Sequence, residues 1–408
     1  MMHKSPLAAA ALALATILFT PKPAHAAPAC FPAWSATAVY TAGGQASQSS
    51  INYTANWWTQ GNSPATNNGG SGTGEPWTSN GACSGSTTPP PPPPPPPNGP
   101  APTPGNPMFA PYLDFGLNAG DGVPTIQSQS GIQIFTLAFI VDNGSCQASW
   151  GGLDITIPND TLVNGSTVLS VIQQIRSSGG DVIISFGGQN GTDISAACTT
   201  AAQVQAMYQS VIDRYTPTMI DFDVENTPEE TPDAIEFRNQ ALVAIKKANP
   251  NLYISFTLPV LPTGLATGFP TQGVGILASI KSSGLEPDLI NVMAMDYGTD
   301  VDNGGKMGTD AVDAATATYQ QVQAAGLTSA IGITPMIGVN DTQPETFQLA
   351  DATTVLNFAK ANTWVKRLGY WSVSRDNGGC AGVKYAEDTC SGLTQSDYAF
   401  ATIFEAFK

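Results

Sequence analysis

The stretch Met219-Ile220-Asp221-Phe222-Asp223-Val224-Glu225 alternates apolar and acidic side chains without a break. Neighbouring residues of a β-strand point to opposite faces, so the apolar side chains share one face and the three carboxylates share the other. The apolar face needs a covering layer, and the acidic face needs polar surroundings. Such a strand fits the wall of a closed barrel, with helices outside and carboxylates inside.

The sequence from Phe109 onward supports this interpretation, because short apolar strands alternate with helical periodicity. Eight strands are predicted: Phe109–Phe115, Ile134–Val141, Val182–Gly187, Met219–Glu225, Tyr253–Val260, Ile290–Tyr297, Ala330–Gly338 and Gly369–Arg375. Six helices are clearest: Ser166–Ser177, Ala201–Tyr215, Pro232–Ala248, Thr309–Ala325, Ala352–Ala361 and Gln395–Phe407. The pattern predicts an α/β fold, a (β/α)8 barrel, with a doubly wound open sheet as the alternative. Functional residues then belong at the carboxyl ends of the strands.

The three carboxylates of the fourth strand are costly to bury together, because burial and mutual repulsion both oppose ionisation. Glu225 lies nearest the barrel mouth and is expected to hold a proton near neutral pH, as a general acid requires. Asp223 should lie two residues deeper, roughly 6.6 Å away. The competing interpretations are a solvated edge strand and a calcium loop.

The amino terminus predicts a signal peptide over residues 1–26. Basic residues precede an apolar run from Leu7 to Leu18, which is followed by the small-residue triplet Ala24-His25-Ala26. That run is too short to span a bilayer, which needs about 20 residues. We therefore expect a secreted, extracellular protein with no membrane partner. The six cysteines fit an oxidising environment, and sequence order suggests the pairs Cys30–Cys83, Cys146–Cys198 and Cys380–Cys390 without fixing them.

Both histidines of the chain, His3 and His25, lie in the predicted signal peptide. Ser-His-Asp catalysis, Cys-His catalysis and histidine-ligated zinc are thereby excluded from the mature protein. The formal net charge of −16 makes nucleic acid a poor partner. Carboxylates are left as the main acid-base groups, and we expect no cofactor and no metal.

Three further segments complete the predicted domain organisation. Residues 27–83 are rich in Trp, Tyr, Ser and Asn and poor in aliphatic residues, which is typical of a small β-rich module stapled by a disulfide. Residues 84–107 contain nine consecutive prolines, Pro89 to Pro97, and are predicted to be a semi-rigid linker. The barrel domain occupies residues 108–408.

The fourth strand resembles the end of the Asp-x-x-Asp-x-Asp-x-Glu signature of family 18 glycoside hydrolases. Three of the four acids match, whereas Thr218 stands in place of the first Asp. On the third strand, Ser185-Phe186-Gly187-Gly188 resembles the Ser-x-Gly-Gly element of that family. We expect Ser185 to hydrogen-bond into the carboxylate cluster beside the sugar.

Two later strands extend this resemblance. Met293-Ala294-Met295-Asp296-Tyr297 is similar to the Met-x-Tyr-Asp segment of the family, with Met295 in the usual place of the Tyr. Met293 and Asp296 are then expected to bind substrate, and Tyr297, two residues beyond Met295, to supply the phenol. Trp371 resembles the Trp that forms the floor of the sugar site. Ordinary core positions for Trp371 and a capping role for Asp296 are the alternatives.

The resemblance implies a secreted chitinase that needs no protein nucleophile, because the 2-acetamido oxygen of the substrate attacks the sugar carbon. Glu225 would then be the acid and base. Asp223 would orient the acetamido group, Asp221 would share a proton with Asp223, and Tyr297 would bind the acetamido carbonyl. The expected partners are chitin and N-acetylglucosamine oligomers, bound by a monomer.

The segment 27–83 resembles small chitin-binding modules of bacterial secreted hydrolases, and we expect Trp57, Trp58 and Tyr40 to contact sugar. Two other functions stay open: an endo-β-N-acetylglucosaminidase acting on N-glycans and a non-catalytic chitin-binding lectin. Between the predicted seventh and eighth strands, Gly338 and Gly369 leave no room for an extra α+β domain. We therefore expect an open groove and internal cleavage of the polymer.

Overall fold

The computed structural model describes residues 30–36, 38–69, 73–83, 103, 105–115, 122–151, 155–157, 159–162, 165–225, 231–298, 301 and 305–407. The chain divides into two compact units, Met1–Pro92 and Pro93–Lys408. The predicted signal peptide, residues 1–26, and most of the predicted linker, residues 84–107, lie outside the described residues. Among the described helices, none combines the length and the apolar character that crossing a membrane requires.

The first unit is built from short antiparallel strands. Strands β2 (Gln45–Gln48), β3 (Ile51–Ala55) and β5 (Trp77–Ala82) form one sheet in the order β2-β3-β5, and β1 (Val39–Tyr40) pairs with β4 (Thr59–Gln60). Its buried apolar cluster holds only Ala46, Tyr53, Ala55 and Trp77, with a few partly buried neighbours. A disulfide between Cys30 and Cys83 joins the first and last described residues of the unit. A core this small depends on such a covalent link.

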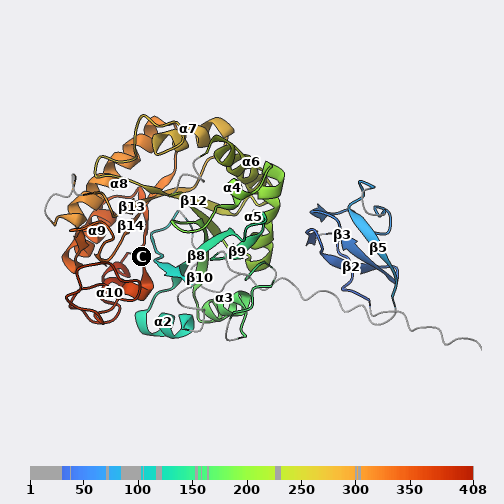
Figure 1. The fold of residues 1–408 in the computed structure, drawn as a ribbon, viewed down its shortest axis with the longest axis horizontal. Helices are drawn as coiled ribbons and strands as arrows, with labels where there is room; N and C mark the ends of the chain where they lie inside the picture. Colours follow the sequence, from blue (N-terminus) through green and yellow to red (C-terminus); the bar gives the residue numbers. More distant parts are fainter. Residues whose placement is uncertain are drawn as a thin grey trace, which may run out of the picture. The chain divides into compact units, whose positions relative to one another are not determined.

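The second unit is a closed barrel of parallel strands, which confirms the predicted fold class (Figure 1). The strand order is β6-β17-β14-β13-β12-β11-β10-β8-β7. The first barrel strand is interrupted, since its halves β6 and β7 pair with different neighbours and so close the sheet on itself. The strands are β6 (Met108–Phe109), β7 (Tyr112–Asp114), β8 (Ile134–Asp142), β10 (Asp181–Gly187), β11 (Met219–Asp223), β12 (Tyr253–Pro259), β13 (Leu289–Ala294), β14 (Ala330–Pro335) and β17 (Val365–Leu368).

Helices surround the strands, as Figure 1 shows for the coloured segments from α2 to α10. They are α2 (Val123–Ser130), α3 (Val168–Ser177), α4 (Ile194–Ala197), α5 (Ala201–Tyr215), α6 (Pro232–Ala248), α7 (Val274–Ser283), α8 (Met307–Ala324), α9 (Leu349–Ala361) and α10 (Ala399–Phe404). The predicted bounds of α5 and α6 are confirmed at both ends. Hydroxyl caps set their starts: Thr200 accepts from the Gln203 amide, and Thr231 accepts from the Ala234 amide just before Pro232.

The eighth strand lies earlier in the chain than predicted. The ladder with β14 and β6 covers Val365–Leu368, and the segment predicted as a strand, Gly369–Arg375, follows it. The prediction was wrong because Lys366 and Arg367 make Val365–Leu368 look polar, whereas the aromatic pair Tyr370-Trp371 is typical of a strand. Trp371 still continues the strand direction through a single parallel bridge to Met336.

The barrel interior is layered. Residues at the amino ends of the strands form their own apolar cluster, made of Met108, Ala110, Ile134, Ile183, Met219 and Leu289. The residues two positions further along several of these strands are polar, as in Thr136, Ser185, Asp221 and Asn291. A polar layer therefore lies on an apolar one, with the carboxyl ends of the strands beyond it.

Two disulfides fasten surface segments of the barrel unit. Cys146 bonds to Cys198, and Cys380 bonds to Cys390. Together with the bond in the first unit, they pair all six cysteines as sequence order suggested, and the described residues include no free cysteine.

A short hairpin of β15 (Gly338–Val339) and β16 (Thr346–Phe347) follows β14, and β9 (Ala148–Trp150) pairs antiparallel with β8.

Candidate active site

The alternation along β11 places its residues as predicted. Ile220, Phe222 and Val224 belong to the large apolar core shared with the helices. Asp221 and Asp223 are buried on the opposite side and so face the barrel interior. Glu225, just past the end of β11, is partly buried. The three carboxylates therefore rise through the barrel toward its carboxyl end.

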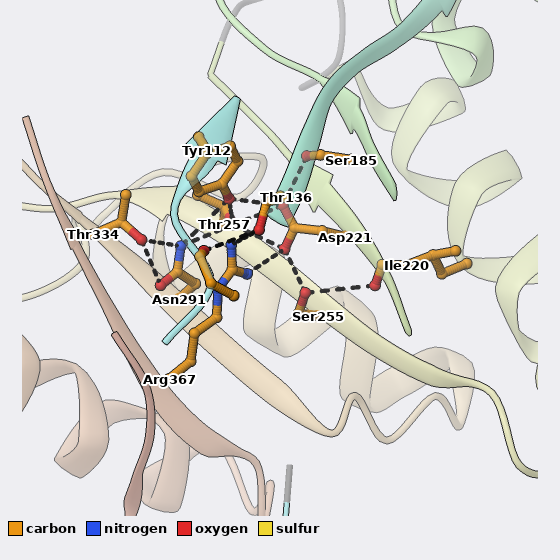
Figure 2. Close-up of polar contacts among 11 residues, drawn as sticks. Tyr112, Thr136, Ser185, Ile220, Asp221, Ser255, Thr257, Asn291, Thr334 and Arg367 are labelled. Carbon is orange, nitrogen blue, oxygen red and sulfur yellow. Dashed lines mark hydrogen bonds and ion pairs between the residues drawn. The ribbon is translucent and has the colours of Figure 1, made fainter. Parts of the chain in front are cut away.

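Asp221 accepts hydrogen bonds from several side chains of the barrel interior (Figure 2). One oxygen, Oδ2, accepts from the Tyr112 hydroxyl at 2.9 Å, from Ser185 at 2.8 Å and from Thr257 at 3.0 Å. The other, Oδ1, accepts from the Ser255 hydroxyl and lies 2.9 Å from the Thr257 hydroxyl, whose single hydrogen the two oxygens share. These donors come from β10 and β12, which flank β11, and from β7, which lies beyond β8 in the sheet, so three other strands fix the carboxylate.

The guanidinium of Arg367, on β17, compensates the charge of Asp221. Its Nη1 lies 3.4 Å from Asp221 Oδ1, and both side chains are fully buried. The Thr136 hydroxyl accepts from Nη2 at 2.8 Å, and the guanidinium carbon lies 5.0 Å from the centre of the Tyr112 ring. Gly332 leaves space for the neighbouring side chains, because a methyl group there would lie 2.5 Å from Asn291 Oδ1 and 3.2 Å from the Arg367 Cβ. Arg367 could not be predicted from the sequence, because Asp221, Tyr112 and Thr136 are brought to it only when the barrel closes.

Glu225 has the chemistry of a general acid. Burial, followed by the charge of Asp296, raises its pKa to about 7, although hydrogen bonds with the Gln189 backbone and with Asp223 act in the opposite direction. A carboxyl group with this pKa is largely protonated in mildly acidic solution and can still ionise, so it can donate and recover a proton. Asp223 lies two residues earlier in the sequence, and its side chain is hydrogen-bonded to that of Glu225.

Asp296 lies close enough to Glu225 to act on it electrostatically. The backbone amide of Thr342 donates to Asp296 Oδ1 at 2.7 Å, and this bond ties the end of β13 to the loop after β15. Partial burial of the carboxyl group and the neighbouring Asp341 raise the pKa of Asp296. Asp296 thus belongs to the acidic rim around Glu225, and its side chain caps no helix.

Tyr297 does not face the carboxylates as we expected. Strand β13 ends at Ala294, and Asp296 has a φ of 51°, so the alternation that put Tyr297 beside Met295 stops before it is reached. The side chain is buried in the outer apolar core, and its phenol makes no hydrogen bond to a described residue. The charges that act on it come from Asp310, Glu345 and Asp313, and with burial they raise its pKa well above the usual value. The assignment of the phenol to the sugar site was therefore wrong.

Three aromatic rings, those of Trp371, Phe139 and Tyr112, lie next to one another near the Asp221 hydrogen bonds. Trp371 is partly buried and stacks against Phe139, with ring centres 5.7 Å apart and an interplanar angle of 16°. Its ring centre is 6.1 Å from that of Tyr112, which links it to the donors of Asp221. Gly188, with a φ of 89°, makes room for the Phe139 ring, because a methyl group at that position would lie 2.6 Å from it. Phe139 was missed because one aromatic residue in an apolar strand carries no sequence signal of its own.

The remaining predicted site residues are distributed as follows. Ser185 donates to Asp221 at 2.8 Å, as expected, and its side chain is fully buried. Met293 is partly buried in β13, in register with Thr334. Thr218, in the place of the missing family Asp, donates to Asp181 at 3.3 Å, and Asp181 is paired with Arg176.

The three aromatic residues predicted in the first unit differ in exposure. Trp57 and Trp58, between β3 and β4, are 45% and 41% exposed, more than any other described aromatic residue of this unit. Tyr40 is partly buried, its ring packs edge-on against Trp77, and its hydroxyl accepts from the Ser35 amide at 2.8 Å. The tryptophans are therefore exposed enough to contact a ligand, whereas the ring of Tyr40 packs against the small apolar core.

No protein-family model matches the chain. Two curated proteins do. A probable bifunctional chitinase/lysozyme of Escherichia coli K12 is 31% identical over 322 residues, which are 74% of this chain and 34% of that protein. Endochitinase 11 of Metarhizium anisopliae is 31% identical over 289 residues, which are 66% of this chain and 52% of that protein. The chain thus spans about a third of one relative and about half of the other.

Among solved structures, active domain 2 of the chitinase from Pyrococcus furiosus, in catalytic-site mutants, has a TM-score of 0.64 and 29% identity. The match covers 76% of this chain and 97% of that domain. The same domain with bound chito-oligosaccharides matches with a TM-score of 0.62 and 28% identity.

A barrel with carboxylates at the carboxyl end of β11 and aromatic rings in the same unit is an arrangement that can bind a sugar and hydrolyse a glycosidic bond. The names of both relatives and of these solved structures include chitinase, and the strand motifs of β11 and β10 resemble those of family 18 glycoside hydrolases. In the part of the chain that the structure describes, no group of three or more His, Cys, Asp or Glu side chains is placed to hold a metal ion.

Proposed function

We propose that this protein hydrolyses the β-1,4 bonds between N-acetylglucosamine units of chitin. The observation that carries the proposal is Glu225, a carboxyl group with a pKa of about 7 that is hydrogen-bonded to Asp223 at the barrel mouth. The aromatic face of Trp371, supported by Phe139, suits the apolar face of a sugar ring. The names of both curated relatives include chitinase, and this supports the choice of substrate.

The proposed mechanism is substrate-assisted and retains configuration. Glu225 donates its proton to the glycosidic oxygen as the bond from that oxygen to the sugar carbon breaks, and the acetamido oxygen of the same sugar forms a new bond to that carbon. Asp223, beside Glu225, orients the acetamido group and stabilises its positive charge. Water then displaces the acetamido oxygen and gives a proton back to Glu225. The internal nucleophile reacts at high effective molarity, so a protein nucleophile is unnecessary.

Internal cleavage of the polymer is the proposed mode of action. The segment between β14 and β17, all of it described, contains only the β15–β16 hairpin and α9. An additional α+β domain, which would wall the groove on that side, is absent from these residues. A chain bound in an open groove is held weakly at its ends, which favours cleavage at internal bonds.

We further propose that the protein is secreted as a monomer and that its first unit binds chitin. The apolar stretch near the amino terminus and the three disulfides support export. The exposed neighbours Trp57 and Trp58 support binding to a flat face of the polymer. Removing this unit should affect insoluble chitin only.

The decisive experiment compares Glu225→Gln with the unmodified protein on N-acetylglucosamine oligomers and on an N-glycosylated protein. Glutamine keeps the shape of the side chain but has no proton to donate, so turnover of the oligomers should fall by about 10²- to 10⁴-fold. Glu236→Gln, an exposed position on α6, is the matched control and should keep full activity.

The outcomes separate the candidate functions. Release of glycans without oligomer cleavage would indicate an endo-β-N-acetylglucosaminidase. Binding of oligomers without cleavage by the unmodified protein would indicate a lectin. A well-folded Glu225→Gln protein that cleaves oligomers at the normal rate would contradict the assignment of the acid.

A further inference from the structure

The turn of the β15–β16 hairpin is hydrogen-bonded to both ends of the short segment Asp296-Tyr297-Gly298, which follows β13. The Thr342 amide donates to Asp296 Oδ1 at 2.7 Å, and the Gly298 amide donates to Glu345 Oε1 at 2.9 Å. One bond runs from the turn to the segment and the other from the segment to the turn. Asp296 is therefore fixed directly by Thr342 and also through the chain by Glu345.

Glu345 is a rigid part of this turn. Its amide donates to the Thr342 carbonyl oxygen at 3.1 Å, and its own carbonyl oxygen accepts from the Asn340 amide at 3.0 Å. The side-chain amide of Asn340 donates to the carbonyl oxygens of Met336 and Gly338, at 2.9 and 3.0 Å. The Glu345 side chain is buried, with 1% of its surface exposed. Its acceptor oxygen is thus held in place by a hydrogen-bonded backbone and by its packing.

The hairpin is anchored in turn to the segment after β17. Arg375, at the end of the short 3-10 helix Val373–Arg375, donates from Nη2 to the carbonyl oxygens of Ile337 at 3.0 Å and Val339 at 2.6 Å. The Val339 amide donates to the Ser391 carbonyl oxygen at 2.9 Å. The hairpin is therefore a fixed support for the segment after β13.

That segment needs a support. Asp296 has a φ of 51°, in the left-handed region, where residues other than glycine are uncommon. A residue keeps such a conformation only where its surroundings impose it. The charge of Asp296 acts on Glu225. A rotation at Asp296 would therefore change the distance between these two carboxyl groups.

We infer that Glu345 is a positioning residue, which holds Asp296 beside Glu225 by accepting a hydrogen bond from the Gly298 amide. The inference rests on the proposed function. Glu345 acts here as an acceptor and not as a charge, so an uncharged acceptor of the same length should replace it.

The charged groups that face Asp296 come from three other segments. They are Glu225 after β11, Asp341 in the hairpin turn and Arg375 after β17. Glu225 is also hydrogen-bonded to Asp223 on β11. These are the groups that can respond when Asp296 moves.

Glu345 lies nearer to α8. Its charge acts on the phenol of Tyr297, together with the charges of Asp310 and Asp313 on α8. The charges with the largest effect on Glu225 are instead those of Asp296 and Asp341. Loss of the charge at position 345 should therefore change the pKa of Glu225 little, whereas loss of the acceptor should change it through Asp296.

The test measures the alkaline limb of kcat/KM on a soluble N-acetylglucosamine oligomer. Glu345→Ala removes the acceptor, so Asp296 should move away from Glu225 and the pKa of Glu225 should fall. Because Glu225 donates only while protonated, the limb should move to lower pH, by at most the shift that Asp296→Asn causes. The maximum of kcat/KM should fall by about tenfold. Glu345→Gln keeps an oxygen for the Gly298 amide and should keep the limb in place.

Three further variants sharpen the test. Glu345→Asp keeps the carboxyl group but is one methylene shorter, so it should move the limb as alanine does. In the Asp296→Asn protein, adding Glu345→Ala should not move the limb further, because the charge that Glu345 positions is already gone. Thr346→Ala is the matched control on the same hairpin and should leave the limb unchanged, since its hydroxyl bonds the Pro344 carbonyl oxygen at 3.4 Å.

A folded Glu345→Asp or Glu345→Ala protein with the limb of the unmodified protein would overturn the inference, even if its thermal midpoint fell. Equal shifts in Glu345→Gln and Glu345→Ala would also overturn it, as would shifts that add in the double variant. Loss of the fold in both Glu345→Ala and Glu345→Asp, checked by circular dichroism, would assign Glu345 to stability alone and would overturn it as well.

The pKa of Glu225 can also be followed by carbon-13 NMR of its carboxyl group, which needs no turnover. It should fall in Glu345→Ala and stay in place in Glu345→Gln. Failure of the unmodified protein to cleave the oligomer would refute the proposed function, and the NMR titration would still measure the effect of Glu345 on Glu225.

Discussion

Asp296 sets the working pH of Glu225 more than any other charged side chain. After burial, its charge is the largest influence that raises the pKa of Glu225, whereas Asp341 contributes least among the causes that raise it. Asp296→Asn keeps an oxygen for the Thr342 amide and removes only the charge. Because a neutral neighbour makes ionisation of Glu225 easier, its pKa should fall.

The expected result is an alkaline limb of kcat/KM that moves from near pH 7 to lower pH in Asp296→Asn. Glu225 donates only while protonated, so activity is lost as pH rises through its pKa. Asp341→Asn is the matched control and should move the limb less. Equal shifts in both variants, or a shift to higher pH, would contradict the assignment.

The residues on β11 could be predicted, and those reached from distant strands could not. Strict alternation made Asp221, Asp223 and Glu225 visible in one local segment. Arg367 and Phe139 come from β17 and β8, and only the closed sheet brings them to β11. Tyr297 was misplaced because a strand pattern was extended past Ala294, into a segment where Asp296 adopts a left-handed conformation.

Gly188, the residue after β10, leaves space for the ring of Phe139, which stacks on Trp371. Gly188→Ala should push Phe139 away from Trp371, because the added methyl group has no space beside the ring. Gly284, the left-handed residue after α7, is a matched control: its φ is 80°, and a methyl group there would meet no atom within 4 Å.

Gly284→Ala should lose about 1 to 2 kcal/mol of stability, because alanine is forced into a left-handed conformation, and Gly188→Ala should lose at least as much, because its methyl group also meets Phe139. Only Gly188→Ala should also raise KM for oligomers, by about tenfold for a loss of roughly 1.4 kcal/mol of binding. Thermal unfolding and steady-state kinetics give the two quantities. A KM that rises equally in Gly284→Ala would refute the role of Phe139.

Elements with strong local signals were predictable. Helices α5 and α6 begin at threonine caps and keep a regular apolar period, and both were placed correctly. Helix α7 was missed, because it begins after Gly273, has no capping side chain and contains a second glycine within its first turn. Strand β17 was displaced because its basic residues point to partners that no local pattern reveals.

The open side of the barrel between β14 and β17 should determine how the polymer is cut. Internal cleavage shortens long chains early, so the viscosity of a soluble chitin derivative should fall well before reducing ends accumulate. Both quantities can be followed in one reaction. Dimer that dominates from the first minutes, with nearly constant viscosity, would indicate attack at chain ends.

The first unit should matter only when the substrate is a solid. Deleting residues 27–107 removes the exposed Trp57 and Trp58 together with the linker. Hydrolysis of insoluble chitin should then weaken, because the barrel is no longer held at the surface, while short oligomers are cleaved as before. Trp57→Ala with Trp58→Ala in the full-length protein should reproduce the deletion. Equal losses on both substrates would contradict a tethering role.

The apolar layer across the amino ends of the strands has a consequence for isotope exchange. Met108, Ile134, Ile183, Met219 and Leu289 form a buried layer at that end, and the Arg367 guanidinium beyond them is fully buried. Its labile hydrogens should therefore exchange with deuterium far more slowly than those of exposed side chains, and a sugar bound over Trp371 should slow this exchange further.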